Sequence, residues 1–217
     1  MSKKIAVILA GCGFKDGSEI TEAVSVLIAL SQKKATVYCF APEENKIAIN
    51  HLTFQPYEHS RSLLEEAARI CRGQIQGLNS LVAADFDGLV IPGGSGALKN
   101  LSTWSTDGHR CQLNSELQKV LKDFYQQSKP IAAVCIAPVM VAKALGAHKI
   151  EITIGNNPEL AAEVAKTGAV PIDCPVDDHV SDREHKILST PAYMYDASPA
   201  EVFKGIQGMV HELVEWC

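Results

Sequence analysis

The sequence predicts a three-layer α/β fold with a mostly parallel central sheet. Apolar runs rich in β-branched residues alternate along the chain with segments of helical periodicity, an order typical of successive βα units. Residues 4–10 and 87–92 are apolar almost without interruption, which indicates strands covered by helices on both faces. We therefore expect a flavodoxin-like sandwich of helices, parallel sheet and helices.

These patterns place strands and helices along the chain. Strands are expected at residues 4–10, 35–40, 87–92, 131–134, 150–154 and 186–190. The first helix is expected to begin at an N-cap, Ser18, and to pack on the sheet through Ile20, Ala23, Val24, Leu27 and Ile28. Further helices are expected at residues 62–72, 113–127, 136–145, 158–167 and 199–216. Residues 43–57 and 96–110 match neither period, so we expect loops over a site there.

Length and composition indicate one globular domain, residues 1–217. The formal net charge is −5 and no basic block could follow a phosphate backbone, so we expect no nucleic-acid partner.

Every apolar run is too short or too interrupted to cross a bilayer, and residues 1–4 lead directly into a strand, leaving no room for a signal peptide. We expect a cytoplasmic protein. The seven scattered cysteines are expected to be free thiols without a bound metal.

Cys135 is the strongest candidate for chemistry. It stands between the apolar strand at residues 131–134 and the following helix. A sharp strand-to-helix turn would lift its side chain clear of the sheet, and the free N–H groups of the helix start would lower the thiol pKa. This predicts a nucleophile that is reactive at neutral pH. The alternative is a small buried hydrophobic residue, the usual role of a free cysteine.

Two further features favour the nucleophile. Gly93 and Gly94 follow a buried strand, and their backbone N–H groups are free to approach an oxyanion, although such glycines also form plain tight turns. Glu22 lies in the first turn of the first helix, beyond the end of the first strand, where ligands of open α/β sheets collect. Its apolar helix neighbours would raise its pKa, as suits an acid–base residue; otherwise it is an ordinary acid near a helix start.

The chain resembles the ThiJ/PfpI superfamily and, within it, the ElbB-type glyoxalase-like proteins, also described as isoprenoid biosynthesis proteins with an amidotransferase-like domain. The resemblance covers nearly the full length. It rests on ordered matches at residues 7–13, 16–20, 22–24, 39–42, 50–53, 66–70, 92–94, 99–102, 135–138, 153–155, 174–178 and 190–194.

The resemblance implies a class I glutamine amidotransferase-like fold, a homodimer, and a reactive cysteine hydrogen-bonded to Glu22. By analogy it implies a glutathione-independent glyoxalase, a lyase that acts on a small dicarbonyl without a cofactor. One departure is that many members carry a histidine about twenty residues after the nucleophile, whereas residues 152–157 contain none. His148 and His179 are the histidines nearest in sequence, and we expect both to be surface residues. Activities that require a cysteine activated by a histidine, such as those of amidotransferases and peptidases, are therefore disfavoured.

The predicted mechanism places a Cys135 hemithioacetal in the site. Its oxyanion is held by the N–H groups of Gly94 and Ile136, and Glu22 moves a proton between the adjacent carbons. Two alternatives remain: a hydrolase or deglycase acting on glycated or amide substrates, and a redox sensor or interaction protein in which Cys135 is oxidised. Packing roles are expected for Cys12, Cys111 and Cys174.

Overall fold

A seven-stranded sheet forms the centre of the molecule in the computed structural model, which describes residues 2–217. Six strands are parallel and the edge strand β10 is antiparallel to β11, in the order β10-β11-β7-β6-β1-β2-β5. The strands are β1 (Lys4–Ile8), β2 (Thr36–Ala41), β5 (Ile75–Gly77), β6 (Gly88–Ile91), β7 (Ile131–Val134), β10 (Val180–Asp182) and β11 (Ile187–Thr190). The predicted fold class is confirmed.

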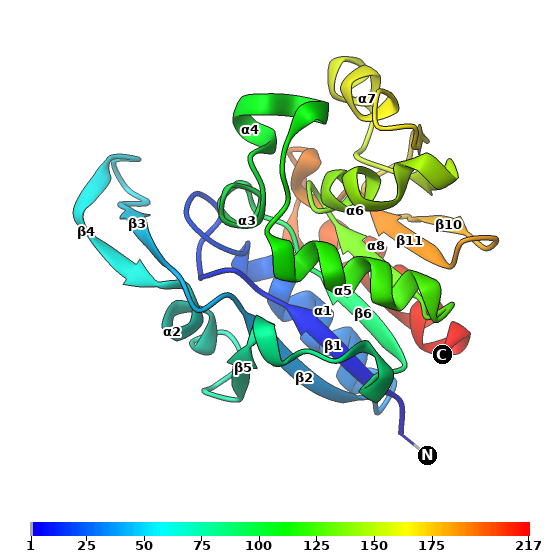
Figure 1. Cartoon of the computed structure of the whole chain (residues 1–217), viewed down its shortest axis with the longest axis horizontal. Helices are drawn as coiled ribbons and strands as arrows, with labels where there is room; N and C mark the ends of the chain where they lie inside the picture. The colour runs from blue at the N-terminus through cyan, green and yellow to red at the C-terminus, as the bar shows by residue number, and fades with distance from the viewer. Residues whose placement is uncertain (1) are drawn as a thin grey trace.

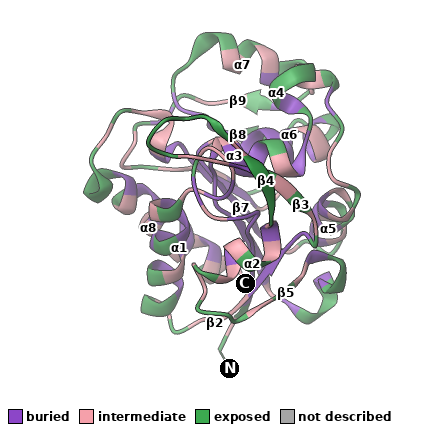
Figure 2. Cartoon of the chain, turned by 90° about the vertical axis from the view of Figure 1, so that its left-hand side faces the viewer, coloured by how far each residue is buried: buried purple, intermediate pink, exposed green. Residues whose placement is uncertain are grey.

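Helices cover both faces of this sheet (Figure 1). Along β1, Ile5 and Val7 pack in one apolar cluster, whereas Ala6 and Ile8 pack in the other, because successive strand residues point to opposite faces. The first cluster includes residues of α1 (Ile20–Gln32), α2 (Leu63–Ala68) and α8 (Pro199–Trp216). The second includes residues of α3 (Ser95–Leu101), α4 (Trp104–Asp107), α5 (Ser115–Gln126), α6 (Pro138–Leu145) and α7 (Pro158–Ala165). Buried residues therefore concentrate in the strands and on the inner helix faces (Figure 2).

The first helix departs from its predicted orientation. Its N-cap is Glu19, whose side chain accepts the N–H of Glu22, while Ser18 is buried and its hydroxyl accepts the N–H of Ala10 at 3.0 Å. The face toward the sheet consists of Glu22, Ala23, Ser25, Val26, Ala29 and Leu30. Ile20, Val24 and Ile28 are exposed, so only Ala23 of the predicted stripe is buried and Leu27 is half-buried. The helix is apolar on more than one face, and periodicity alone selected the wrong one.

Both segments predicted to be loops contain regular structure. Residues 43–57 include β3 (Asn45–Ile49) and the start of β4 (Pro56–Ser62), an antiparallel hairpin that projects from the body of the molecule (Figure 1). Residues 96–110 contain most of α3 and all of α4. The strand expected at residues 150–154 is shorter, and as β8 (Glu151–Ile152) it pairs with β9 (Val170–Pro171) rather than with the central sheet.

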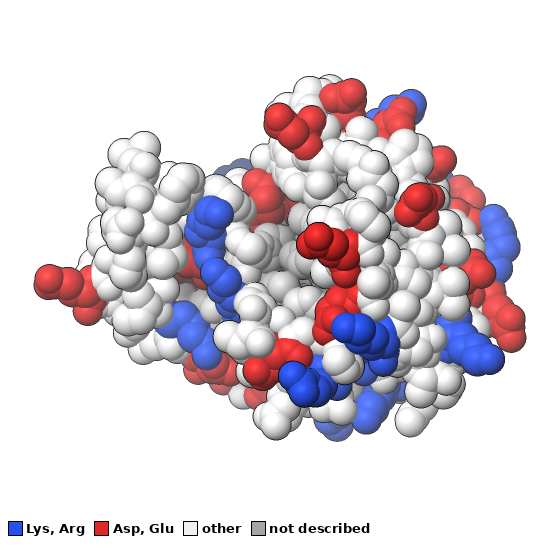
Figure 3. All heavy atoms as spheres, turned by 90° about the horizontal axis from the view of Figure 1, so that it is seen from above, with Lys and Arg blue, Asp and Glu red and all other residues white. Residues whose placement is uncertain are grey.

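The surface carries charges of both signs. Acidic and basic side chains are interspersed on the face shown in Figure 3, and no continuous basic stripe crosses that face. Among residues 2–217, no helix is both long and apolar enough to span a bilayer.

Candidate active site

Cys135 stands on a tight turn between β7 and α6. Its backbone adopts a left-handed conformation with φ of 62°, which is uncommon for a residue other than glycine and is typical of sharp turns at functional sites. Its N–H donates to the carbonyl of Thr190 at 2.8 Å, and the N–H of Ala137 closes the turn on Val134 at 2.9 Å. Helix α6 then begins at Pro138, which needs no N–H partner in the first turn. The side chain is 7% exposed and faces a cavity.

Glu22 meets Cys135 beneath this cavity. It occupies the first turn of α1 and is fully buried, with its carboxyl group hydrogen-bonded to the Cys135 side chain. Two backbone N–H groups hold the carboxyl in place, from Gly93 to Oε2 at 3.0 Å and from Tyr193 to Oε1 at 3.4 Å. The structure therefore brings together the two predicted catalytic side chains, which are separated by more than a hundred residues of sequence.

The titration of this pair differs from the expectation for the thiol. Burial and, to a smaller extent, the Glu19 carboxylate together raise the pKa of Glu22 to about 8, as anticipated for an acid–base residue. Burial also raises the pKa of the Cys135 thiol well above its ordinary value, and the Glu22 carboxylate adds to this effect. The N–H groups of Gly94 and Ile136 oppose the shift without reversing it. The predicted lowering of the thiol pKa is wrong, because desolvation outweighs the amides near the helix start.

The backbone amides expected to hold an oxyanion divide into two kinds. The N–H groups of Gly94 and Ile136 point at the Cys135 sulfur, where an oxyanion on a bound carbon would form. Gly93 instead donates its N–H to Glu22, and its carbonyl accepts the N–H of Glu19 at 3.0 Å. A Cβ on Gly93 would lie 2.5 Å from the Cβ of Cys135 and 2.6 Å from Oε2 of Glu22, so only glycine fits there. Gly93 therefore positions Glu22, and its amide is not free for a substrate.

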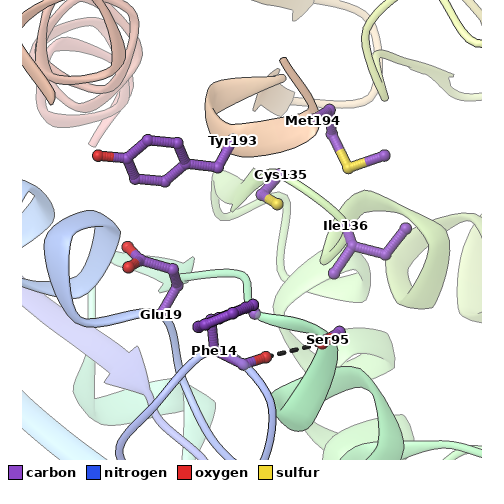
Figure 4. Close-up of a pocket in the computed structure, with 8 residues that line it drawn as sticks. Phe14, Glu19, Ser95, Cys135, Ile136, Tyr193 and Met194 are labelled. Atoms are coloured by element: carbon purple, nitrogen blue, oxygen red, sulfur yellow. Dashed lines mark hydrogen bonds between the residues drawn. The ribbon is translucent and has the colours of Figure 1, made fainter. Parts of the chain in front are cut away.

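The cavity above Cys135 has a volume of about 510 Å³ (Figure 4). Its lining residues are Phe14, Glu19, Gly94, Ser95, Cys135, Ile136, Tyr193 and Met194. Sequence reasoning missed Phe14, Glu19, Ser95, Tyr193 and Met194. Tyr193 and Met194 follow the carboxyl end of β11, and Ser95 that of β6, so the rule that ligands collect at this edge of a parallel sheet could have found them.

Other candidate residues lie outside this cavity. His148 packs its ring on Tyr125, and the Nε2 of His179 lies 2.8 Å from the carboxylate of Glu212. None of Cys12, Cys111 and Cys174 lines the cavity. Across residues 2–217, no group of three or more His, Cys, Asp or Glu side chains is arranged to hold a metal ion.

The doubly covered parallel sheet and the cysteine on its strand-to-helix turn define an amidotransferase-like α/β protein. Residues 3–182 match the sequence profile of the DJ-1/PfpI family, and the chain therefore belongs to that family. The resemblance to the ThiJ/PfpI superfamily is confirmed at this level.

Individual relatives cover almost the whole chain. The human glutamine amidotransferase-like class 1 domain-containing protein 3, mitochondrial, is 40% identical over 98% of this chain and 82% of its own length. The rat ES1 protein homolog, mitochondrial, is 39% identical over 98% of this chain and 83% of its own. A crystal structure of an isoprenoid biosynthesis protein with amidotransferase-like domain from Ehrlichia chaffeensis is 38% identical, has a TM-score of 0.92, and covers 99% of both chains. The names of the human and rat relatives specify mitochondria, so the cytoplasmic location of this chain stays a prediction. The homodimer also stays a prediction.

Proposed function

We propose that this chain is an ElbB-type, glutathione-independent glyoxalase that converts glyoxal or a similar small dicarbonyl to a 2-hydroxy acid. The observation that carries the proposal is the hydrogen-bonded pair of Cys135 and Glu22 at the floor of the cavity. A sulfur nucleophile and a carboxyl group with a pKa of about 8 supply the two functions that such an isomerisation needs. The resemblance to the isoprenoid biosynthesis protein supports the ElbB-type assignment.

The reaction starts with addition of the Cys135 sulfur to one aldehyde carbon of glyoxal. A C–S bond forms, and the thiol proton reaches the former carbonyl oxygen to give a hemithioacetal, while the amides of Gly94 and Ile136 stabilise the developing oxyanion. The Glu22 carboxylate then removes the hydrogen from this carbon, and the carboxylic acid returns a proton to the neighbouring carbon, while the hydroxyl proton of the hemithioacetal passes to the remaining aldehyde oxygen. One carbon is oxidised to a thioester and the other is reduced to an alcohol. Water cleaves the thioester to glycolate and restores the thiol.

The cavity also favours this chemistry over Cys-His catalysis. Among residues 2–217, no histidine belongs to its lining, and the partner of the sulfur is a carboxyl group rather than an imidazole. Amide hydrolysis requires a group that protonates the leaving amine, the task that histidine performs in cysteine hydrolases. Isomerisation of an aldehyde has no amine leaving group. A carboxyl group with a pKa of about 8 suits proton transfer between carbons near neutral pH.

The proposal is tested by incubating the purified protein with glyoxal in the absence of glutathione and following glycolate by proton NMR. We expect stoichiometric conversion of glyoxal to glycolate. A parallel reaction with a glycated amino acid is run with and without a dicarbonyl scavenger. If glycated substrate is consumed equally well with the scavenger present, while glyoxal alone is not converted, the protein is a deglycase and the glyoxalase proposal fails.

The reactivity of Cys135 should depend on pH in a way set by the buried pair. The nucleophilic state requires the Cys135 thiol to lose its proton, and burial, together with the neighbouring Glu22 carboxylate, raises the pKa of this thiol well above its ordinary value. The rate of alkylation by iodoacetamide should therefore rise about tenfold per pH unit from about pH 6 and still be rising at about pH 9. Peptide mass spectrometry resolves Cys135 from the other cysteines. A rate already constant at about pH 6 would mean that the thiolate is stable at neutral pH, as helix-start electrostatics alone predicts.

A further inference from the structure

The cavity above Cys135 has an unbalanced set of charged groups. Four of its lining side chains are apolar or aromatic: Phe14, Ile136, Tyr193 and Met194. Glu19 is the acidic residue of the lining, and within the described part of the chain no Lys, Arg or His joins it there. The carboxyl group of Glu22 lies beneath the same sulfur. A substrate that reaches Cys135 therefore meets carboxyl groups and no cation.

Glu19 is held in the cavity wall by the start of α1. Its Oε2 accepts the N–H of Glu22 at 2.6 Å, and the residue is only partly exposed. Figure 4 shows its side chain among the residues that line the cavity. Burial raises its pKa, whereas the N–H groups of Glu22, Thr21 and Ile20 favour its ionised form. The backbone therefore fixes the direction in which this charge points, and rotation into bulk water would break the N-cap hydrogen bond.

Lys15 places a cation beside Phe14, one of the residues that line the cavity. Its Nζ lies 4.9 Å from the centre of the Phe14 ring and 5.1 Å from that of Phe54, in a cluster with the β3–β4 hairpin. Lys15 is not part of the cavity lining, and two aromatic rings already engage its ammonium group. The charge of Glu19 consequently has no neutralising partner inside the cavity.

We propose that Glu19 determines which substrates reach Cys135: the cavity admits uncharged and cationic carbonyl compounds and rejects anionic ones, such as keto acids and phosphorylated carbonyls. An anion that enters this partly desolvated space loses hydration and meets the Glu19 carboxylate of the cavity lining, without a compensating positive charge there. A neutral dicarbonyl loses less hydration on entry and is not repelled by the carboxylate. That these compounds are substrates rests on the proposed glyoxalase function, whereas the selection against anions depends only on their access to the Cys135 sulfur.

Two alkylating reagents of nearly equal size test this selection without any turnover. Iodoacetamide is neutral and iodoacetate is anionic, and both label Cys135 at rates that peptide mass spectrometry measures. At about pH 8, we expect the ratio of the two rates to exceed that of free glutathione by about tenfold or more in the natural protein. In Glu19→Gln, the ratio should fall toward the glutathione value. In the control Glu159→Gln, which removes an acid from the first turn of α7 outside the cavity, the ratio should not change.

The variant Glu19→Asp tests whether the change in the rate ratio of Glu19→Gln comes only from its altered N-cap, because aspartate keeps both the negative charge and the ability to cap the helix. It should retain the discrimination of the natural protein, provided that circular dichroism shows all variants folded. An unchanged ratio in a folded Glu19→Gln variant, or a natural protein that resembles glutathione, would overturn the inference. Failure of the glyoxal assay with intact charge discrimination would instead reject the proposed reaction alone, so the two claims are separable.

Discussion

Replacement of Cys135 by serine should lower glycolate formation from glyoxal by at least about a thousandfold. A serine hydroxyl at this position has no imidazole to activate it, since its neighbour is the carboxyl group of Glu22 and the cavity lining holds no histidine from the described part of the chain. Serine is only slightly smaller than cysteine. The turn is held by backbone hydrogen bonds from Cys135 to Thr190 and from Ala137 to Val134, which do not depend on the side chain. The fold should therefore persist, with a change of about 1 kcal/mol or less in the free energy of unfolding.

The measurement is the rate of glycolate formation by NMR, with urea unfolding as the check on stability. Cys71→Ser is the matched control, because Cys71 is also a free thiol but lies outside the cavity. It should retain full activity. Undiminished turnover in Cys135→Ser would show that the sulfur takes no part in the reaction.

Replacement of Glu22 by glutamine should lower turnover by about a hundredfold to a thousandfold, the usual contribution of a general base. Glutamine keeps the side-chain length and an acceptor for the N–H of Gly93, but it cannot carry a proton between carbons. Cys135 should still be alkylated by iodoacetamide, so loss of turnover with retained labelling would separate proton transfer from nucleophilic addition. Natural turnover in this variant would remove Glu22 from the mechanism.

The same variant should alter the pH dependence of stability. Burial raises the pKa of Glu22 in the folded protein to about 8, above its ordinary value of 4.5, so the folded state binds this proton more tightly. The corresponding stability is fully present below the unfolded pKa and is lost as pH rises through the folded pKa. Between about pH 5 and about pH 8.5, the natural protein should lose a few kcal/mol of unfolding free energy that Glu22→Gln retains. Urea titrations at both pH values measure the difference, and parallel losses in the two proteins would contradict the assigned cause.

Much of the architecture could be predicted because strand and helix periodicity are local properties of the sequence. The runs that became β1, β6 and β7 are apolar on both faces, and such runs are stable only between two helical layers. Strands β5 and β10 were missed since each spans three residues, too few for alternation to show. The β3–β4 hairpin was missed because its strands are mostly exposed and polar, and pairing with each other rather than burial makes them strands.

The candidate site was also predictable only in part from the sequence. A cysteine after one buried strand and glycines after another were visible in the sequence, and the edge rule for parallel sheets predicted that they meet. The contribution of Glu19 was hidden because Ser18 is the stronger N-cap residue by preference, yet its hydroxyl accepts the N–H of Ala10 instead. The sign of the Cys135 pKa shift depended on how completely the site is buried, and burial is a property of the assembled layers.

The sequence by itself determined the order of βα units, the nature of the two catalytic candidates and their places after the first strand and at the strand-to-helix turn. Only the tertiary structure decided which face of α1 is buried, that the amide of Gly93 binds Glu22 rather than a substrate, and that burial raises the pKa of the Cys135 thiol. Periodicity and turn chemistry act over a few residues, whereas desolvation and hydrogen-bond choice depend on groups brought together from distant parts of the chain.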